Sequence, residues 1–270
     1  MLRSYELLGV TMSIECLVIG GTLAAWICER PYYGNIISVP ESMGIDTQYT
    51  SIQHLGLGDI EVATDKIATT YFDKSHGPRI LIGHSQGAII AGLLAMRYPE
   101  RVLTVIALAG PYKGTAWTDP QSMAIKLAIE GIGQFTRGVV PLKPNLPRSR
   151  LSKLVGSFVP VVRDLSSDSE ILRRLSRYLE AQNSGPTTHS IIATDDRFVI
   201  PSRSAHPNGP MVHKYLAAHP NIHHHLHGRI PEEIELLAFK AGHVLMVNDI
   251  GVLELIKNII NSEVLQSNSR

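Results

Sequence analysis

The chain has 270 residues and 44% hydrophobic content, enough for one large domain with a real core, with or without an insertion. Its formal net charge of +1 gives no overall attraction to nucleic acid, so we expect no nucleic-acid partner. The two cysteines, Cys16 and Cys28, provide no disulfide framework, and Cys16 lies in a predicted core strand, which favours a buried thiol over a redox role.

The apolar run Leu7–Trp26 resembles a targeting or membrane segment only at first sight. Glu15 and then Gly20-Gly21-Thr22 interrupt it, whereas a spanning helix needs about 20 uninterrupted apolar residues. Met1-Leu2-Arg3 is a poor basic leader, and no small-residue cleavage site follows a clean apolar stretch. We therefore expect a buried strand here. A cytoplasmic location is slightly favoured over secretion, and removal of a leader before this sequence would leave secretion open.

Strands and helices are predicted to alternate along the first part of the chain. The expected elements are strands at Cys16–Ile19 and Asn35–Pro40, a helix at Asp59–Phe72, a strand at Arg79–Ile82, a helix at Ala88–Tyr98 and a strand at Arg101–Ala109. The near-continuous apolar strands suit a parallel sheet that is covered by helices on both faces. This alternation predicts an α/β fold with a mostly parallel, doubly wound sheet.

The pattern changes between Gly114 and Gly185, where no convincing strand occurs. This segment contains helical stretches at Gln121–Phe135 and Ser169–Gln182, with a Pro-rich piece at Val140–Pro147. We predict that residues 114–185 form a helical cap inserted in a single domain that spans residues 1–270. The alternative is that part of this segment consists of helices that flank the sheet. The sheet pattern then resumes at two strands and ends in a helix, expected at His189–Thr194, Glu235–Phe239 and Val244–Ile260.

The most informative motif is Gly83-His84-Ser85-Gln86-Gly87, which lies between a predicted strand and a predicted helix. A Gly-x-Ser-x-Gly sequence in this setting is typical of a nucleophile elbow. The two glycines let the backbone turn sharply without a Cβ clash, so that the Ser85 hydroxyl stands exposed above the sheet. An unactivated serine is a weak nucleophile, so this interpretation requires a histidine base and an acid that orients it.

Candidates for both partners follow later strands in the order acid, then histidine. Asp195 and Asp196 come after the predicted strand His189–Thr194, and His243 comes after Glu235–Phe239. Open α/β sheets place their sites at the carboxyl ends of the strands, where Ser85 also lies. His243 would take the Ser85 proton and later deliver it to the leaving group, while one aspartate would hold the other ring nitrogen.

An oxyanion hole needs two backbone N–H groups directed at the developing negative charge. One is expected from Gln86, the residue after the nucleophile. The other is expected from the loop after the first strand, Gly20 to Leu23, where small residues let the backbone approach a substrate closely. Thr22 could add its hydroxyl as a further donor.

These motifs together resemble the α/β-hydrolase lipases and esterases, in particular the class that includes fungal lipase B and bacterial extracellular lipases. The resemblance is carried by Gly20-Gly21-Thr22, Ser85-Gln86-Gly87, Pro111–Thr115 and Asp196-x-x-Val199-x-Pro201. It implies an α/β-hydrolase fold, Thr22 in the oxyanion position and Asp196 rather than Asp195 as the acid. It also implies substrate contacts for Gly21, Leu23, His84 and Tyr112.

Two further features lie outside these motifs. The histidines between His219 and His227 fit no standard zinc spacing, so we expect a solvated loop and no metal site. The cap carries more lysine and arginine than acidic residues, which leaves open a transient contact with a membrane or lipid surface. Its apolar helix Met123–Phe135 fits either a lid or the core of the cap.

The sequence therefore predicts a carboxylic-ester hydrolase, an esterase or lipase, that forms an acyl-enzyme on Ser85 with Asp196 and His243. The substrate would be a small-molecule or lipid ester, and no cofactor is expected. Three alternatives remain: an acyltransferase on the same triad, a hydrolase of thioesters, amides or lactones, and a non-catalytic binding protein on a hydrolase fold. The sequence predicts no oligomeric state.

Overall fold

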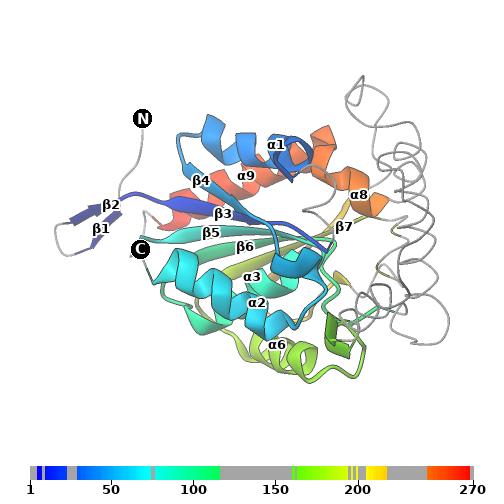
Figure 1. The fold of residues 1–270 in the computed structure, drawn as a ribbon. Helices are drawn as coiled ribbons and strands as arrows, with labels where there is room; N and C mark the ends of the chain where they lie inside the picture. Colours follow the sequence, from blue (N-terminus) through cyan, green and yellow to red (C-terminus); the bar gives the residue numbers. More distant parts are fainter. Residues whose placement is uncertain are drawn as a thin grey trace.

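The computed structural model describes residues 5–7, 10–22, 29–73, 77–115, 160–161, 163–193, 196, 199, 205–217 and 242–267. Within these residues the molecule is built on one parallel sheet of six strands (Figure 1). The strands are β3 (Glu15–Ile19), β4 (Asp46–Thr50), β5 (Arg79–His84), β6 (Val102–Leu108), β7 (Thr187–Ala193) and β8 (Val212–Ala217), and their order across the sheet is β4-β3-β5-β6-β7-β8. The predicted α/β class and parallel sheet are confirmed.

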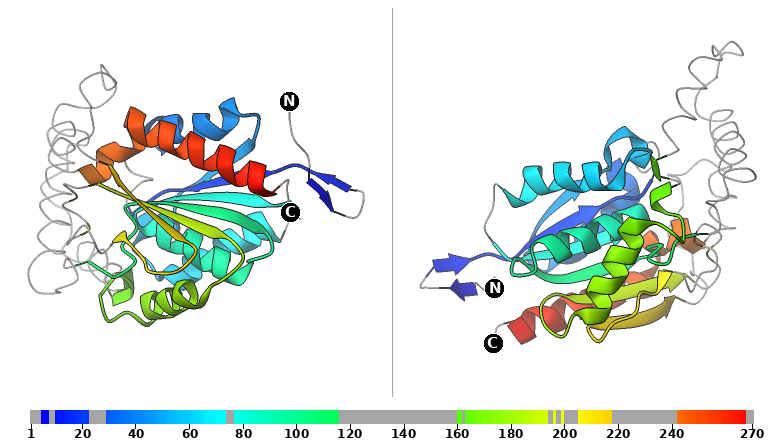
Figure 2. Two further views of the ribbon diagram at one scale, coloured as in Figure 1. Left: turned by 180° about the vertical axis from the view of Figure 1, so that it is seen from behind. Right: turned by 90° about the horizontal axis from the view of Figure 1, so that it is seen from below.

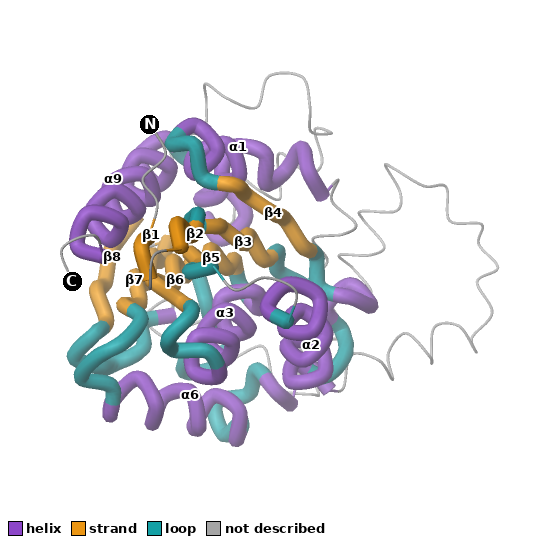
Figure 3. The backbone as a smooth tube through the Cα atoms, turned by 90° about the vertical axis from the view of Figure 1, so that its left-hand side faces the viewer, coloured by secondary structure: helices purple, strands orange, loops and turns teal. Residues whose placement is uncertain are grey.

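Helices cover both faces of this sheet (Figures 1 and 3). Helices α1 (Glu29–Ser42) and α9 (Ile250–Ser267) lie on one face, and α2 (Ile60–Ile67), α3 (Gln86–Arg97) and α6 (Glu170–Ala181) lie on the other (Figure 2). Shorter elements are η2 (Gln53–Gly56), η3 (Ala68–Phe72), α8 (Gly242–Leu245) and η7 (Met246–Asn248). Among the helices described, none combines the length and apolar content that crossing a membrane requires.

The central strands β3, β5 and β6 divide their side chains between two hydrophobic layers. Cys16 and Val18 of β3 pack in the layer under α1 and α9, whereas Leu17 and Ile19 pack in the layer with α2, α3 and α6. This alternation follows from the two-residue period of a strand, and it lets both faces be buried. Burial raises the pKa of the Cys16 thiol, which agrees with the predicted inert core cysteine.

The chain winds outward from β3 in two directions. It passes first to β4 on one side of β3 and then returns to β5 on the other side, from which β6, β7 and β8 follow in sequence. Open α/β sheets bind ligands outside the carboxyl ends of the strands where the winding reverses. In this sheet that place lies between β3 and β5, where Ile19 is paired with Gly83. A separate hairpin, β1 (Tyr5–Leu7) with β2 (Val10–Met12), lies at the opposite end of the sheet from α8 (Figure 1).

The strand predicted at Asn35–Pro40 is wrong, because these residues belong to α1. The buried side chains of Tyr33, Ile36, Ile37 and Pro40 recur at the three- and four-residue spacing of one helix face. A short apolar run fits a strand and a buried helix equally well, so the run itself did not separate the two. The strand that follows β3 along the chain is instead β4 (Asp46–Thr50).

The two edge strands, β4 and β8, were not predicted, for a related reason. Strand β4 lacks a buried face, since every residue from Asp46 to Thr50 is at least partly exposed, and β8 is exposed at His213, Lys214 and Leu216. Neither strand therefore shows an apolar run in the sequence. The predicted strand Glu235–Phe239, the helix Gln121–Phe135 and the piece Val140–Pro147 lie outside the described residues.

The predicted helix Ser169–Gln182 is confirmed as α6, and it packs on α3. A Cβ added to Gly92 of α3 would lie 3.1 Å from the Leu175 side chain, and the Tyr178 hydroxyl donates to the Ala95 carbonyl at 3.4 Å. This part of segment 114–185 therefore flanks the sheet. Residues 116–159 lie outside the described residues, and the cap remains a prediction for them.

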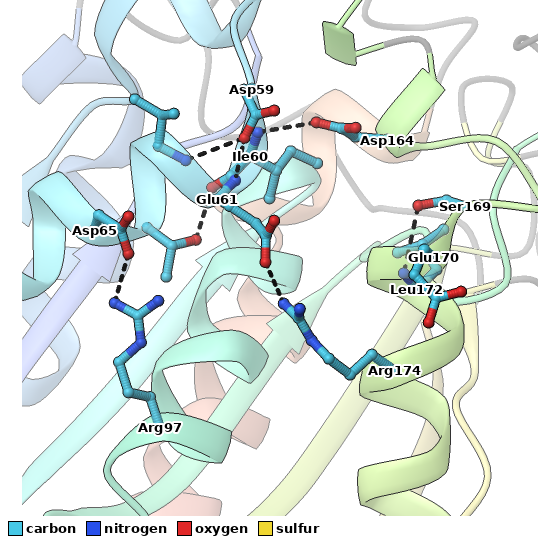
Figure 4. A network of polar contacts seen from close by, with 12 residues as sticks. Asp59, Ile60, Glu61, Asp65, Arg97, Asp164, Ser169, Glu170, Leu172 and Arg174 are labelled. Carbon is cyan, nitrogen blue, oxygen red and sulfur yellow. Dashed lines mark hydrogen bonds and ion pairs between the residues drawn. The ribbon is translucent and has the colours of Figure 1, made fainter.

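A polar network ties the chain that enters α6 to the start of α2 (Figure 4). Asp59 caps α2, and the buried carboxylate of Asp164 accepts the Ile60 N–H at 3.0 Å. Arg174 of α6 pairs with Glu61 of α2. Carboxylates at a helix N-terminus satisfy N–H groups that have no intrahelical partner and complement the helix dipole. The chain from Arg163 to Arg174 is thereby fixed against the start of α2.

The start of α3 is pressed against the end of β3. A Cβ added to Gly87 would lie 2.3 Å from the Ile19 carbonyl oxygen and 2.5 Å from that of Gly20. A Cβ added to Gly83 would lie 2.4 Å from the Gly87 carbonyl oxygen. Both glycines of the motif are therefore required by backbone contact, because no side chain is available that could move away.

We predict that Gly87→Ala destabilises the fold by about 1–3 kcal/mol, since the new methyl group overlaps backbone atoms. Gly34→Ala is the matched control, because Gly34 lies within α1 with no atom within 4 Å of an added Cβ. That control is expected to keep or raise stability by up to about 1 kcal/mol. Urea denaturation measures both. Equal stabilities of the two variants would contradict the close contact.

Candidate active site

Ser85 occupies a strained turn between β5 and α3. Its backbone angles, φ 55° and ψ −123°, are uncommon for a residue with a side chain and carry a cost of about 1–3 kcal/mol. The turn is held by hydrogen bonds from the Ser85 N–H to the Leu108 carbonyl at 2.8 Å and from the Ala88 N–H to the Ser85 carbonyl at 3.0 Å. Ser85 remains partly exposed while its neighbours are buried, as expected of a nucleophile elbow.

Asp196 and His243 are brought together by the fold. His243 Nδ1 lies 2.8 Å from Asp196 Oδ2, and Asp196 Oδ1 accepts the Val199 N–H at 2.8 Å. Both side chains are buried. Because a carboxylate only accepts, Nδ1 of His243 carries the proton, which leaves Nε2 of a neutral imidazole as an acceptor. Asp195, the other acidic candidate, lies outside the described residues.

His84 connects the Ser85 turn to His243. Its Nε2 lies 2.8 Å from the His243 carbonyl oxygen, and the two imidazole rings are 4.9 Å apart between centroids. Its Nδ1 lies 2.9 Å from the Tyr33 hydroxyl, which also accepts the Gly21 N–H at 3.0 Å. The residue that precedes Ser85 is therefore bonded to the backbone of His243, although the two are far apart in the sequence.

The loop after β3 lies directly on the Ser85 turn. A Cβ added to Gly21 would come within 2.9 Å of the Ser85 Cβ, so only glycine fits here without a shift. The Thr22 hydroxyl donates to Gln86 Oε1 at 2.8 Å. Gln86 begins α3, where the first N–H groups of a helix have no intrahelical acceptor and the helix dipole favours negative charge. The two loops predicted to form an oxyanion hole are thus in contact.

Two of the predicted substrate contacts occupy interior positions. Both ring nitrogens of His84 are engaged by protein groups. Tyr112 is buried in the layer under α3, and its hydroxyl donates to the Ala88 carbonyl at 3.2 Å. Both side chains therefore serve internal hydrogen bonds in this structure. Gly21 lies at the turn, as described above, and Leu23 lies outside the described residues.

Tyr33 is the residue of this region that the sequence reasoning missed. It belongs to α1, and a strand predicted at Asn35–Pro40 concealed the helical face to which it belongs. The spacing of Tyr33 from Ile36 and Ile37 is the signal that could have found it.

Within the described ranges, no group of three or more His, Cys, Asp or Glu side chains is arranged to hold a metal ion. The histidines from His219 to His227 lie outside those ranges.

Burial dominates the electrostatics of this region. It lowers the pKa of His84 from 6.5 to about 3, and the neighbouring His243 imidazole lowers that pKa further. Burial likewise raises the pKa of Tyr33, although the Gly21 N–H acts in the opposite direction. His84 and Tyr33 are therefore both neutral at neutral pH.

No protein-family model and no curated protein sequence matches this chain. Solved structures do match its fold. A lipase-esterase related protein from Clostridium acetobutylicum aligns with a TM-score of 0.54 and 15% identity over 91% of this chain and 93% of its own. Mouse alpha/beta hydrolase domain-containing protein 10 gives 0.53 and 16% over 93% and 90%. A carboxylesterase structure from the thaumarchaeon Nitrososphaera gargenis gives 0.50 and 16% over 76% and 81%. The chain has the α/β-hydrolase fold.

The buried neutral His84 should make the fold sensitive to acid. The unfolded chain binds a proton at this residue below about pH 6.5, whereas the folded chain resists protonation until about pH 3. The contribution of His84 to the free energy of unfolding is thus fully present above pH 6.5. It decreases as the pH falls toward 3, by at most about 1.4 kcal/mol per pH unit. We predict that the free energy of unfolding of His84→Gln declines less steeply than that of the wild type. Urea denaturation between about pH 7.5 and about pH 5 measures it, and equal slopes would contradict the buried neutral imidazole.

Proposed function

We propose that this protein is a serine hydrolase of carboxylic esters, with Ser85 as nucleophile, His243 as general base and Asp196 as the residue that orients His243. The observation that carries the proposal is the 2.8 Å hydrogen bond between Asp196 and His243. It occurs beside a strained serine turn at the reversal point of the sheet. The order nucleophile, acid, histidine is that of α/β-hydrolases.

In the proposed reaction, the Ser85 oxygen attacks the ester carbonyl while its proton passes to His243 Nε2. The negative charge of Asp196 stabilises the imidazolium that forms. The tetrahedral intermediate then collapses, the His243 proton goes to the leaving alcohol and an acyl-enzyme remains on Ser85. A water oxygen then attacks the acyl carbonyl while its proton passes to His243. The bond between Ser85 and the acyl group breaks, the acid is released and His243 returns the proton to Ser85.

Backbone N–H groups of Thr22 and Gln86 are proposed to hold the oxyanion. The Gly21 N–H is already donated to the Tyr33 hydroxyl, so the next amide along the loop, that of Thr22, is the proposed donor. The Thr22 hydroxyl is donated to Gln86, which fixes the two donor residues relative to each other. Donors fixed in advance stabilise a transition state because they need no reorganisation when charge develops.

The proposed substrate class is a small-molecule or lipid ester. The proposed steps use groups of this chain alone, without a metal or organic cofactor. The lipase-esterase related protein and the carboxylesterase among the structural neighbours support an ester substrate by analogy of fold. Contact with a lipid surface through residues 116–159 of the predicted cap remains part of the proposal, and these residues lie outside the described ones.

Ser85→Ala is predicted to lower kcat on p-nitrophenyl esters by about 10⁴- to 10⁶-fold, because the variant lacks the attacking oxygen. Ser38→Ala is the matched control, since Ser38 is an exposed serine of α1, and its turnover should equal that of the wild type. Esters with short and long acyl chains separate an esterase from a lipase in the same assay. Near wild-type turnover of Ser85→Ala would refute the proposal.

Asp196→Asn is predicted to lower kcat by about 10⁴-fold with little change in overall structure. The asparagine amide can donate to His243 Nδ1, which would move the ring proton to Nε2 and block its use as a base. Ester turnover together with circular dichroism measures this. A variant that is folded and as active as the wild type would exclude Asp196 as the orienting acid.

A further inference from the structure

We infer that Tyr33 and His84 are positioning residues that fix the proposed oxyanion loop and the proposed base relative to each other. The inference rests on the proposed function, because it assigns these side chains a role in that reaction. The relevant groups form one continuous chain: the Gly21 N–H, the Tyr33 hydroxyl, the His84 ring and the His243 carbonyl.

The direction of every hydrogen bond in this chain is determined by chemistry. The His243 carbonyl only accepts, so His84 Nε2 carries a hydrogen and donates. In the neutral ring Nδ1 is then an acceptor, so the Tyr33 hydroxyl donates to it. The Tyr33 oxygen in turn accepts the Gly21 N–H. Each member is thus used in one consistent arrangement, without a competing orientation.

The hydrogen bonds from Gly21 to His243 fix backbone groups of the site, whereas Asp196 fixes the side chain of His243. Asp196 holds the His243 ring through Nδ1, and this bond acts on the side chain of His243 alone. His84 acts on the backbone, since it adjoins Ser85 and holds the His243 carbonyl. The base is therefore held at two points, by Asp196 beyond β7 and by His84 at the end of β5.

At the Gly21 end, the same series of hydrogen bonds fixes a peptide plane in the proposed oxyanion loop. The Gly21 N–H points to Tyr33, which sets the peptide between Gly20 and Gly21 and so constrains the following peptide, whose N–H belongs to Thr22. Tyr33 comes from α1, on the opposite face of the sheet from α3. The loop is thereby held from α1 and from Gln86 of α3.

Burial makes this arrangement stiff. Tyr33 is 1% exposed and His84 is 6% exposed. The Tyr32 ring packs edge-on against Tyr33, with 4.7 Å between centroids. Hydrogen bonds are stronger in such a low-dielectric surrounding, and breaking one leaves a buried group unpaired. A change at Tyr33 should therefore move reacting groups, and displacements of about 1 Å can cost about 100-fold in rate.

The test is the rate at which a fluorophosphonate reacts with the full chain. In this reaction the Ser85 oxygen bonds to phosphorus, fluoride leaves and the serine proton passes to His243. Tyr33→Phe is expected to react about 10- to 100-fold more slowly and to lower kcat on p-nitrophenyl esters by a similar factor, with KM unchanged. Tyr178→Phe is the matched control, because it removes a hydroxyl that donates to the Ala95 carbonyl on α3. This control is expected to react at the wild-type rate.

A second pair of variants keeps the test decisive if Tyr33→Phe fails to fold. His84→Gln retains a donor for the His243 carbonyl and an acceptor for Tyr33, whereas His84→Leu retains neither. We expect His84→Gln to keep most of the activity that His84→Leu loses.

Two outcomes separate the inference from the proposed function. If the wild type is not labelled at Ser85, the proposed function fails and the positioning role fails with it. If the wild type is labelled but Tyr33→Phe matches Tyr178→Phe, or His84→Gln matches His84→Leu, the positioning role alone is overturned.

Discussion

The close contact between the first turn of α3 and the end of β3 is the constraint on which the candidate site depends. Gly87 lies against the carbonyls of Ile19 and Gly20 with no room for a side chain. This contact places the N-terminus of α3 beside the loop after β3, at the point where the winding of the sheet reverses. Beside this contact, Ser85 has a positive φ where the chain turns from β5 into α3 within one residue. Surrounding packing maintains that strain, as is common at functional sites.

Around this contact, parts of the chain that are distant in sequence are joined by a few buried hydrogen bonds. Asp196 after β7 holds the His243 ring, and His84 at the end of β5 holds the His243 backbone. Tyr33 of α1 extends the connection to Gly21. Since all these bonds are buried, the site is organised before any substrate arrives, which is the condition for electrostatic stabilisation without reorganisation.

Sequence reasoning identified the residues that lie in recognisable local motifs. Ser85 followed from its glycines and its place between strand and helix. The order after later strands indicated His243 and the pair Asp195 and Asp196, and the resemblance to the acid loop of lipases favoured Asp196. The structure joins Asp196 and His243 by a hydrogen bond. Sequence reasoning did not find Tyr33, because the apolar run Asn35–Pro40 suits a strand as well as the helix α1 to which it belongs. Strand β4 was missed because an edge strand with exposed polar residues lacks the apolar signal of a buried one. The role of His84 depends on contacts across the fold, which no local pattern records.

The most direct measurement of the central claim is to trap the acyl-enzyme. The protein is mixed with a p-nitrophenyl ester, quenched with acid while turnover proceeds, digested and analysed by mass spectrometry. The account predicts the acyl group on the peptide that contains Ser85, in an amount that matches the initial burst of p-nitrophenol. Sustained release of p-nitrophenol with no acyl group on that peptide, or with the acyl group on another residue, would contradict it.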